Sequence, residues 1–446
     1  MRTHNRSCRR TLFSFCLTLA LSSTLASAQH YYLASEIGSP SPAMDDAFGV
    51  GLAMGERYIG VGSFRDDVSA GHDGRVYLYD RDTGAYVRTV NRTSASINGS
   101  FGFSIDFDGD LMLVGSPVDG QAGIGTPGAG FLFNANTGEL ITNFYGEIRT
   151  PGDRIGHSVA LQGPLALLGA PGYDEAAPGA GGVHAYSTEL LFQITTLLPD
   201  VPIVDEGFGA SLAIDGNYIV VGAPHSRNSA TQTGSVYVYD VTTGVQLHRI
   251  VPPGSSPGDT VGASVDIDNG VIAIGAPSYT RPGLGSSGIV YTYNAASGTL
   301  IDTYSPPMPS VLGQFGTSVA IDGDRLVVGS SFAFGGSSSP GRVHVFENGT
   351  VERVNVFSIP NGQAFGRHVA AEDGRLAASG TGLSPVEEGF VAVIERFCDA
   401  DINADGSRDF FDVSAFLKFQ FDYNGDGQFD FFDVSAFLAD FNSDCI

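Results

Sequence analysis

The sequence predicts an all-β fold, a seven-bladed β-propeller of four-stranded antiparallel blades, followed by a small C-terminal α-helical calcium-binding domain. An aromatic or branched residue followed by glycine recurs at steps of 53 or 54 residues, with a last step of 50. Repeats of this length are typical of propellers and solenoids. No helix of ten residues fits the pattern before Cys398. The seven copies begin at Phe48, Phe101, Ile155, Phe208, Val261, Phe315 and Phe365.

Each copy predicts four short strands. In the fourth copy, a run after Phe208 reaches the Asp215-Gly216 turn, and a second run ends in the Gly-Ala-Pro triplet 222–224. A Val/Tyr run at 236–239 follows, because β-branched and aromatic residues favour strands. Residues 240–244 predict a hairpin turn, since Asp, Asn and Gly adopt the backbone angles that such turns need. Residues 246–250 supply the last strand.

Closure of the ring is also predicted. The seventh copy has strands after Phe365, at 375–379 and at 390–394, but no fourth strand. Residues 31–37 precede the first copy at the place where the outer strands 86–90 and 140–144 precede later copies. Pairing this segment with blade seven would close the circle and remove an exposed sheet edge.

These repeats resemble the FG-GAP repeat of the integrin α-subunit head, over residues 29–397. The Gly-Ala-Pro element is intact at 169–171, 222–224 and 275–277, and is lost in the seventh copy, where Ser379 lies near the glycine position. We expect the glycines to permit close approach of neighbouring blades, where a Cβ atom would collide, and the Phe side chains to fill the gap between blades. The resemblance also implies Asp-rich calcium loops within blades. Residues 65–74 match that pattern poorly, so we do not predict calcium in the propeller.

Residues 1–28 predict a signal peptide. A basic start precedes a mostly apolar stretch at 12–25, and Ala26-Ser27-Ala28 fits a cleavage site. The alternative is an uncleaved anchor, which the short and Ser-interrupted apolar core disfavours. No later segment is apolar enough to span a bilayer, so we expect a secreted or cell-surface protein.

The C-terminal segment 398–446 predicts two calcium loops, 21 residues apart. Each loop has oxygen-bearing side chains at positions 1, 3, 5, 9 and 12, a backbone-carbonyl position at 7, and glycine at position 6 for the sharp turn. The alternative is a solvated acidic tail. The predicted ligands of two Ca²⁺ ions are Asp401, Asn403, Asp405, Ser407, Asp409, Asp412, Asp422, Asn424, Asp426, Gln428, Asp430 and Asp433.

This segment resembles the dockerin module, a duplicated loop–helix anchor of secreted bacterial proteins. Asp at loop position 12, and the lack of room for an entering helix between Cys398 and Asp401, both fit that module. Loop positions 10 and 11 carry Phe pairs, at 410–411 and 431–432, where cellulosomal dockerins have small or polar residues. The departure weakens the expectation of an ordinary cohesin partner. The sequence leaves open whether the Phe pairs bind a partner or form the core of the module.

The mature chain keeps two cysteines, Cys398 and Cys445. They bracket the C-terminal segment, and an oxidising compartment favours one disulfide between them over two free thiols. The net charge of −25 argues against nucleic-acid binding, because phosphates require a basic surface.

We therefore predict a secreted, non-enzymatic binding or scaffold protein. The propeller would recognise a glycan or protein, and the dockerin-like module would attach the chain to a protein partner or cell-surface component. The alternative is an extracellular polysaccharide-active hydrolase or lyase with its site in the propeller funnel. An acidic or histidine cluster converging on the funnel would favour the enzyme, and a smooth or apolar rim would favour the binder. No catalytic residue is predicted from the sequence.

Overall fold

The computed structural model describes residues 30–41, 46–66, 73–92, 99–120, 125–228, 231–281, 283–307, 309–331, 341–347, 354–357, 362–382 and 389–397. The predicted signal peptide, Cys398, Cys445 and the calcium ligands from Asp401 to Asp433 lie outside these residues. Every regular element among the described residues is a β-strand. The blades lie in one compact unit, Tyr31–Arg396.

Blades one to three each consist of four strands in chain order, paired antiparallel. Blade one has β2 (Phe48–Met54), β3 (Tyr58–Ser63), β4 (Arg75–Asp80) and β5 (Tyr86–Val90). Blade two has β6 (Ser104–Asp108), β7 (Leu111–Ser116), β8 (Ala129–Asn134) and β9 (Leu140–Phe144). Blade three has β10 (Val159–Gln162), β11 (Leu165–Ala170), β12 (Gly182–Ser187) and β13 (Gln193–Leu197).

Blades four to six repeat this order, and two of them carry an additional small hairpin. Blade four has β14 (Ser211–Asp215), β15 (Tyr218–Ala223), β18 (Ser235–Asp240) and β19 (Gln246–Ile250), with the hairpin β16 (Arg227–Asn228) and β17 (Thr231–Gln232). Blade five has β20 (Ser264–Asp268), β21 (Val271–Ala276), β24 (Ile289–Asn294) and β25 (Thr299–Tyr304), with the hairpin β22 (Thr280–Arg281) and β23 (Gly285–Ser286). Blade six has β26 (Phe315–Asp322), β27 (Arg325–Ser330), β28 (Arg342–Glu347) and β29 (Val354–Phe357).

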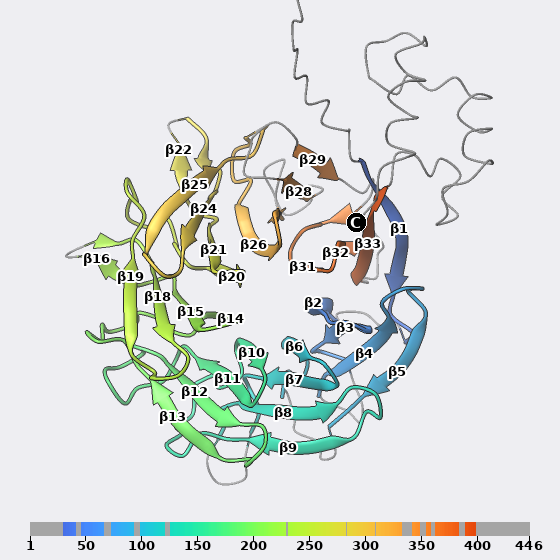
Figure 1. Cartoon of the computed structure of the whole chain (residues 1–446), viewed down its shortest axis with the longest axis horizontal. Coiled ribbons are helices and arrows are strands. Elements are labelled where there is room, and N and C mark those ends of the chain that lie inside the picture. The colour runs from blue at the N-terminus through green and yellow to red at the C-terminus, as the bar shows by residue number, and fades with distance from the viewer. Residues whose placement is uncertain are drawn as a thin grey trace, which may run out of the picture. The chain divides into compact units, whose positions relative to one another are not determined.

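Blade seven is completed by the first strand of the chain, as predicted. It contains β31 (Val369–Glu372), β32 (Arg375–Gly382) and β33 (Gly389–Phe397), and β30 (Gly362–Gln363) also pairs with β32. The strand β1 (His30–Gly38) pairs with β33 as the outer strand of the blade. The described strands thus form seven blades around one axis, with the first strand of each blade innermost (Figure 1).

The turns between third and fourth strands have the chemistry that the sequence predicted. In blade four, the Asp240 carboxylate accepts hydrogen bonds from the amide and the hydroxyl of Thr243, both at 2.7 Å. Gly244 follows with φ of +66°. Blade three departs from this pattern, because Leu191 occupies the glycine position with φ of +59° and is 42 % exposed. A non-glycine residue in this conformation costs roughly 1–2 kcal/mol.

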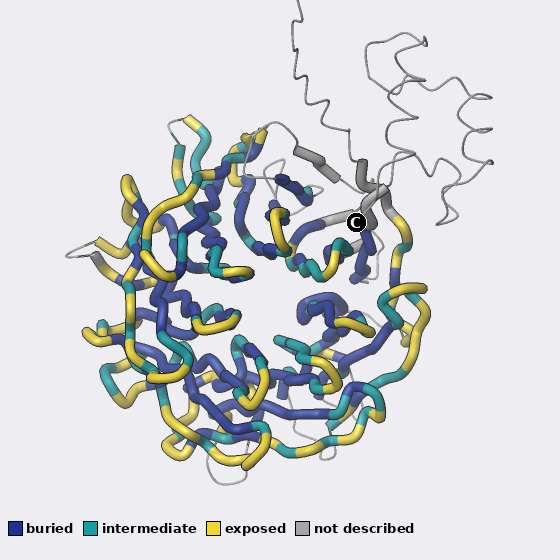
Figure 2. The backbone as a smooth tube through the Cα atoms, viewed as in Figure 1, coloured by how far each residue is buried: buried dark blue, intermediate teal, exposed yellow. Residues whose placement is uncertain are grey.

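The described core residues of the propeller form seven clusters of buried side chains, each shared by two consecutive blades. Each cluster contains the aromatic or branched residue of one repeat; Phe208, for example, packs between blades three and four and contacts Tyr237 and Tyr239 edge-on. The middle strands are therefore buried, whereas the outer strands and turns are exposed (Figure 2). The prediction that these residues fill the gaps between blades is confirmed.

Glycines interlock consecutive blades near the axis. A Cβ atom on Gly222, in the triplet of blade four, would lie 2.1 Å from the carbonyl oxygen of Gly262, in the Val-Gly pair of blade five. Gly115, Gly169 and Gly275 stand in the same relation to the following blade, at 2.1–2.2 Å. The expected close approach is thus confirmed. In blade seven, Ser379 replaces this glycine. Among the described blade junctions, the one between blades seven and one is therefore the only junction with a Cβ atom at this position.

Candidate functional site

The inner strands of all seven blades line an axial channel of about 670 Å³. Among the described lining residues, eight are acidic and none is Lys, Arg or His. The acids come from five of the seven blades, and lie near the end of the inner strand or in the turn that follows it; blades one and three contribute none to the described lining. They are Asp106, Asp108, Asp215, Asp266, Asp268, Asp322, Glu372 and Asp373.

Two of these acids occupy a position that is alanine in the other blades. Asp106 and Asp266 lie five residues after Phe101 and Val261, where the remaining repeats have Ala53, Ala160, Ala213, Ala320 and Ala370. Our sequence analysis did not single them out. An alignment of the seven copies would have found them, because a carboxylate replaces a small apolar residue at one fixed position.

Both carboxylates hold the next blade through its backbone. Asp106 accepts a hydrogen bond from the Leu161 amide of blade three at 2.7 Å, and one from its neighbour Phe107 at 2.9 Å. Asp266 accepts one from the Ile321 amide of blade six at 2.7 Å. Burial among the seven strands raises the pKa of Asp106 and of Asp266 to about 7, against the opposing effect of these amides.

A second set of carboxylates, at the last residue of the inner strand, also accepts hydrogen bonds from backbone amides of the next blade. Asp108 accepts a hydrogen bond from the Gly163 amide at 2.5 Å, Asp268 from Gly323 at 2.6 Å, and Asp322 from Gly374 at 2.8 Å. The inner strand is an edge of each blade, and its unpaired amides need partners. The carboxylates of one blade satisfy amides of the next, which explains part of the acidic lining as structural.

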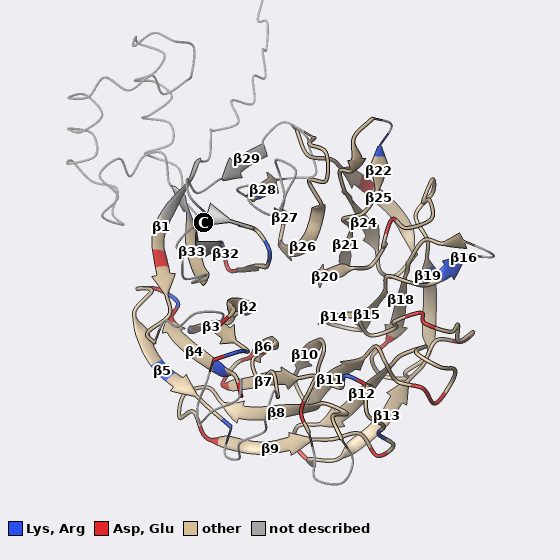
Figure 3. Ribbon diagram, turned by 180° about the vertical axis from the view of Figure 1, so that it is seen from behind, with Lys and Arg blue, Asp and Glu red and all other residues tan. Residues whose placement is uncertain are grey.

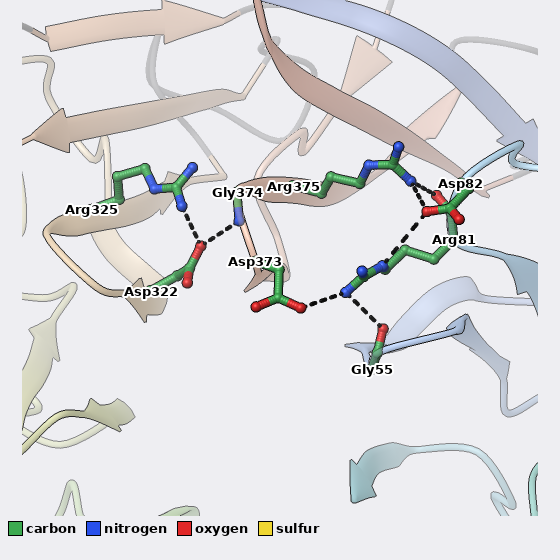
Figure 4. Close-up of polar contacts among 8 residues, drawn as sticks. All are labelled: Gly55, Arg81, Asp82, Asp322, Arg325, Asp373, Gly374 and Arg375. Atoms are coloured by element: carbon green, nitrogen blue, oxygen red, sulfur yellow. Dashed lines mark hydrogen bonds and ion pairs between the residues drawn. The ribbon is translucent and has the colours of Figure 1, made fainter. Parts of the chain in front are cut away.

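Charged side chains also join blade seven to blade one (Figure 4). Arg375 donates to the Asp82 carboxylate at 2.5 Å and to the Arg81 carbonyl at 2.8 Å. Arg81 pairs with Asp373 at 3.2 Å. Asp82 and Asp373 are mostly exposed, so each pair contributes at most about 1 kcal/mol. Elsewhere among the described residues, charged side chains lie both on strands and in the turns and loops between them (Figure 3).

Sequence comparison agrees with this architecture. The FG-GAP repeat family matches the chain at residues 192–239 and 313–346. The chain carries FG-GAP repeats. No curated protein matches it. Each matched stretch contains one aromatic–glycine pair, Phe208-Gly209 or Phe315-Gly316, with the glycine of its following triplet position.

The FG-GAP repeats do not assemble a metal centre within the described residues. No group of three or more His, Cys, Asp or Glu side chains there is arranged to hold a metal ion. In the Asp-rich stretch 65–74, Asp66 lies 3.4 Å from Arg75 and also contacts the Tyr77 hydroxyl. The predicted calcium ligands and the predicted Cys398–Cys445 disulfide lie outside the described residues and remain predictions.

The buried histidines of blades three and six are packed as structural residues. His184 and His344 occupy equivalent places on β12 and β28 and are 0 % and 1 % exposed. Burial lowers the pKa of His184 to about 4 and that of His344 to about 3. His184 contacts the Thr196 hydroxyl at 3.1 Å, and His344 lies edge-on to Phe315.

Two short motifs resemble enzyme signatures by letter only. Residues 254–258 match a nucleophile elbow, which requires a strand-to-helix turn, but they form a loop with turns. Residues 283–288 match a dinucleotide fingerprint but include the hairpin strand β23. Within the part of the chain that the structure describes, no helical segment has the length and hydropathy needed to cross a bilayer.

Proposed function

We propose that this chain is a secreted, non-enzymatic binding or scaffold protein, with the propeller as its recognition face. The FG-GAP propeller fold is consistent with a recognition module. The observation that carries the proposal concerns Asp106 and Asp266, the most chemically distinctive groups at the axis. Both accept hydrogen bonds from backbone amides of the next blade. Carboxylates fixed in this way build a rigid ring, and a rigid ring presents its turns and loops in constant positions.

We further propose that the C-terminal segment 398–446 attaches the protein to a partner or surface in a calcium-dependent manner. The support is the sequence: two twelve-residue loops with complete oxygen sets, and two cysteines that bracket them. Without calcium the loop carboxylates repel one another, so ion binding would supply folding energy. Secretion, proposed from residues 1–28, would supply both calcium and an oxidising environment.

An extracellular hydrolase or lyase is a second candidate function, because a cluster of acidic side chains converges on the axial channel. Burial raises the pKa of Asp106, Asp266 and Glu372 to about 7. A carboxyl group that titrates near neutral pH can act as a general acid. The amide hydrogen bonds to Asp106 and Asp266 argue for the structural role, since a group held by fixed donors is poorly placed to move a proton to a substrate.

The two functions are separated by the fate of the ligand. The full chain is applied to glycan and protein arrays, and each bound ligand is eluted and its mass measured. A binding protein returns its ligand unchanged. Cleavage of a polysaccharide that is lost in Asp106→Asn and Asp266→Asn, but kept in the matched channel variant Asp268→Asn, would contradict our proposal and support the enzyme.

Attachment is tested separately on the full chain. Immobilised protein is exposed to envelope or secreted extract with and without a calcium chelator, beside a variant with Asp401→Ala and Asp422→Ala. Calcium-dependent capture that the variant loses supports the attachment role. Equal capture by both proteins in chelator would refute it.

A further inference from the structure

A polar pocket of about 350 Å³ lies between blades four and five. It is formed by the turns that join first to second strands and third to fourth strands, on one face of the ring. Blade four contributes Asp215, Asn217 and Tyr218 from the β14–β15 turn. Blade five contributes Asn269 from the β20–β21 turn, and Asn294 and Ala296 from the β24–β25 turn.

The equivalent place between blades one and two is closed by side chains. There the Tyr58 hydroxyl and the Arg57 guanidinium both donate to the Asn136 side-chain oxygen at 3.0 Å. The Asn136 amide nitrogen in turn donates to Asp110. These four residues form a bridge across the junction that leaves the tyrosine hydroxyl satisfied.

The same four positions in blades four and five keep the tyrosine but lose its partners. Counted from Phe208 and Val261, Tyr218 corresponds to Tyr58, Asn217 to Arg57, Ala296 to Asn136 and Gly270 to Asp110. At the junction of blades seven and one, the turn position of Ala296 is held by Asp82, which binds Arg375 (Figure 4). The pocket thus exists because an acceptor that bridges two other junctions is here a methyl group.

Polar groups in this pocket are left without protein partners. The Asp215 carboxylate accepts no hydrogen bond from a described residue, whereas its counterparts Asp108 and Asp268 each bind an amide of the next blade. The Tyr218 hydroxyl likewise makes none within the described residues. In Asn294 the side-chain oxygen is used by Ser297, at 2.9 and 3.0 Å, and the amide nitrogen stays available.

We infer that this pocket binds a single saccharide ring. Side-chain amides and a tyrosine hydroxyl both donate and accept hydrogen bonds, and the carboxylate accepts them. Vicinal hydroxyl groups, which also donate and accept, match this set. An ammonium group only donates, so it would satisfy Asp215 and leave the amide donors unmatched. The volume lies near the lower end of ligand pockets, about 300–1,000 Å³, which suits one ring better than a chain.

The inference rests on the proposed binding function and names its ligand class. It is tested on the full chain by saturation-transfer NMR and titration with the methyl glycosides of glucose, galactose, mannose and N-acetylglucosamine. The key variant is Ala296→Asn, which restores the acceptor found in blade two and closes the pocket against Tyr218. The matched control is Thr242→Asn, the corresponding exposed turn position of blade four. Asp215→Ala removes the carboxylate without filling the pocket.

We expect at least one glycoside to bind the wild-type protein, and its dissociation constant to rise tenfold or more in Ala296→Asn and in Asp215→Ala. Thr242→Asn should bind as the wild type does, and all variants should keep the wild-type melting temperature. Binding that Ala296→Asn leaves intact overturns the assigned site but not the binding function. Failure of every glycoside while the arrays yield a protein ligand overturns the ligand class alone. Failure of both overturns the proposed function as well.

Discussion

The contact between glycines of neighbouring blades yields a quantitative prediction for Gly222→Ala. Gly222 does not have positive φ, so alanine fits the backbone and the penalty is steric. Its Cβ atom would lie 2.1 Å from both the Gly262 carbonyl oxygen and the Ser211 hydroxyl, and ordinary contact begins at 3.4 Å. Blade five must therefore move by about 1.3 Å. That movement also breaks the hydrogen bond of 2.9 Å from Ser211 to Gly262.

The expected loss of stability is about 2–4 kcal/mol, from roughly 1–3 kcal/mol for overpacking and about 0.5–1.5 kcal/mol for the hydrogen bond. If the 366 residues of the compact unit unfold together, this corresponds to a fall in Tm of roughly 3–5 °C. The assay is thermal unfolding by circular dichroism, with urea unfolding as a second measure.

Two controls isolate the steric cause. Gly38→Ala adds a methyl group with nothing within 4 Å, so we expect a change below about 0.5 kcal/mol. Ser379→Gly removes a Cβ atom at the one described junction that already accommodates it, and should be similarly mild. If Gly222→Ala has the same Tm as Gly38→Ala, the glycines serve some purpose other than close approach, and our account of the blade junction is wrong.

Four further predictions follow from other parts of the chain. Deletion of β1 (His30–Gly38) should lower Tm and cause aggregation seen by light scattering, because blade seven loses its outer strand; an unchanged melt would mean another closure. Asp106→Ala should gain stability relative to wild type as pH rises from 5 to 8, since the raised folded pKa makes the wild-type carboxylate lose stability as it ionises; a pH-independent difference would refute this. Leu191→Gly should stabilise by about 0.5–1 kcal/mol in urea unfolding by relieving the left-handed conformation, whereas destabilisation would show that the leucine is favoured. Calorimetric titration should find two calcium sites that disappear when residues 398–446 are removed; heat that persists in the truncated chain would place the ions elsewhere.

The sequence predicted the fold almost strand by strand, because the repeat supplies seven samples of one pattern. The predicted outer strand at 246–250 coincides with β19, and the predicted closing segment at 31–37 lies within β1. Asp-Gly and Asx-rich turns fix strand ends through local backbone angles, which sequence reveals directly. Closure of the ring was predictable because the seventh repeat lacks a fourth strand and the segment 31–37 lies outside every repeat.

The candidate sites were less accessible to sequence analysis. Asp106 and Asp266 stand in different blades, and only the ring brings their environments together at the axis. The pocket at Tyr218 exists because Ala296 lacks the side-chain acceptor that Asn136 supplies in blade two. The sequence alone does not show that Asn136 bridges two blades, so it could not show that the bridge is absent at Ala296. The channel acids and the pocket both depend on contacts between different repeats, whereas the periodic sequence pattern shows only which residues each repeat contains.

Closure by β1 also sets an order of events in synthesis. The first strand of the propeller leaves the ribosome early, but its partner β33 begins only after another 350 residues. At elongation rates of about 5–20 residues per second, the wait is roughly 20–70 s. Throughout that time the segment that includes Tyr31 and Tyr32 has no partner strand to pair with. Only a chain synthesised through to Phe397 completes this pairing, so every truncated product keeps its N-terminal strand unpaired.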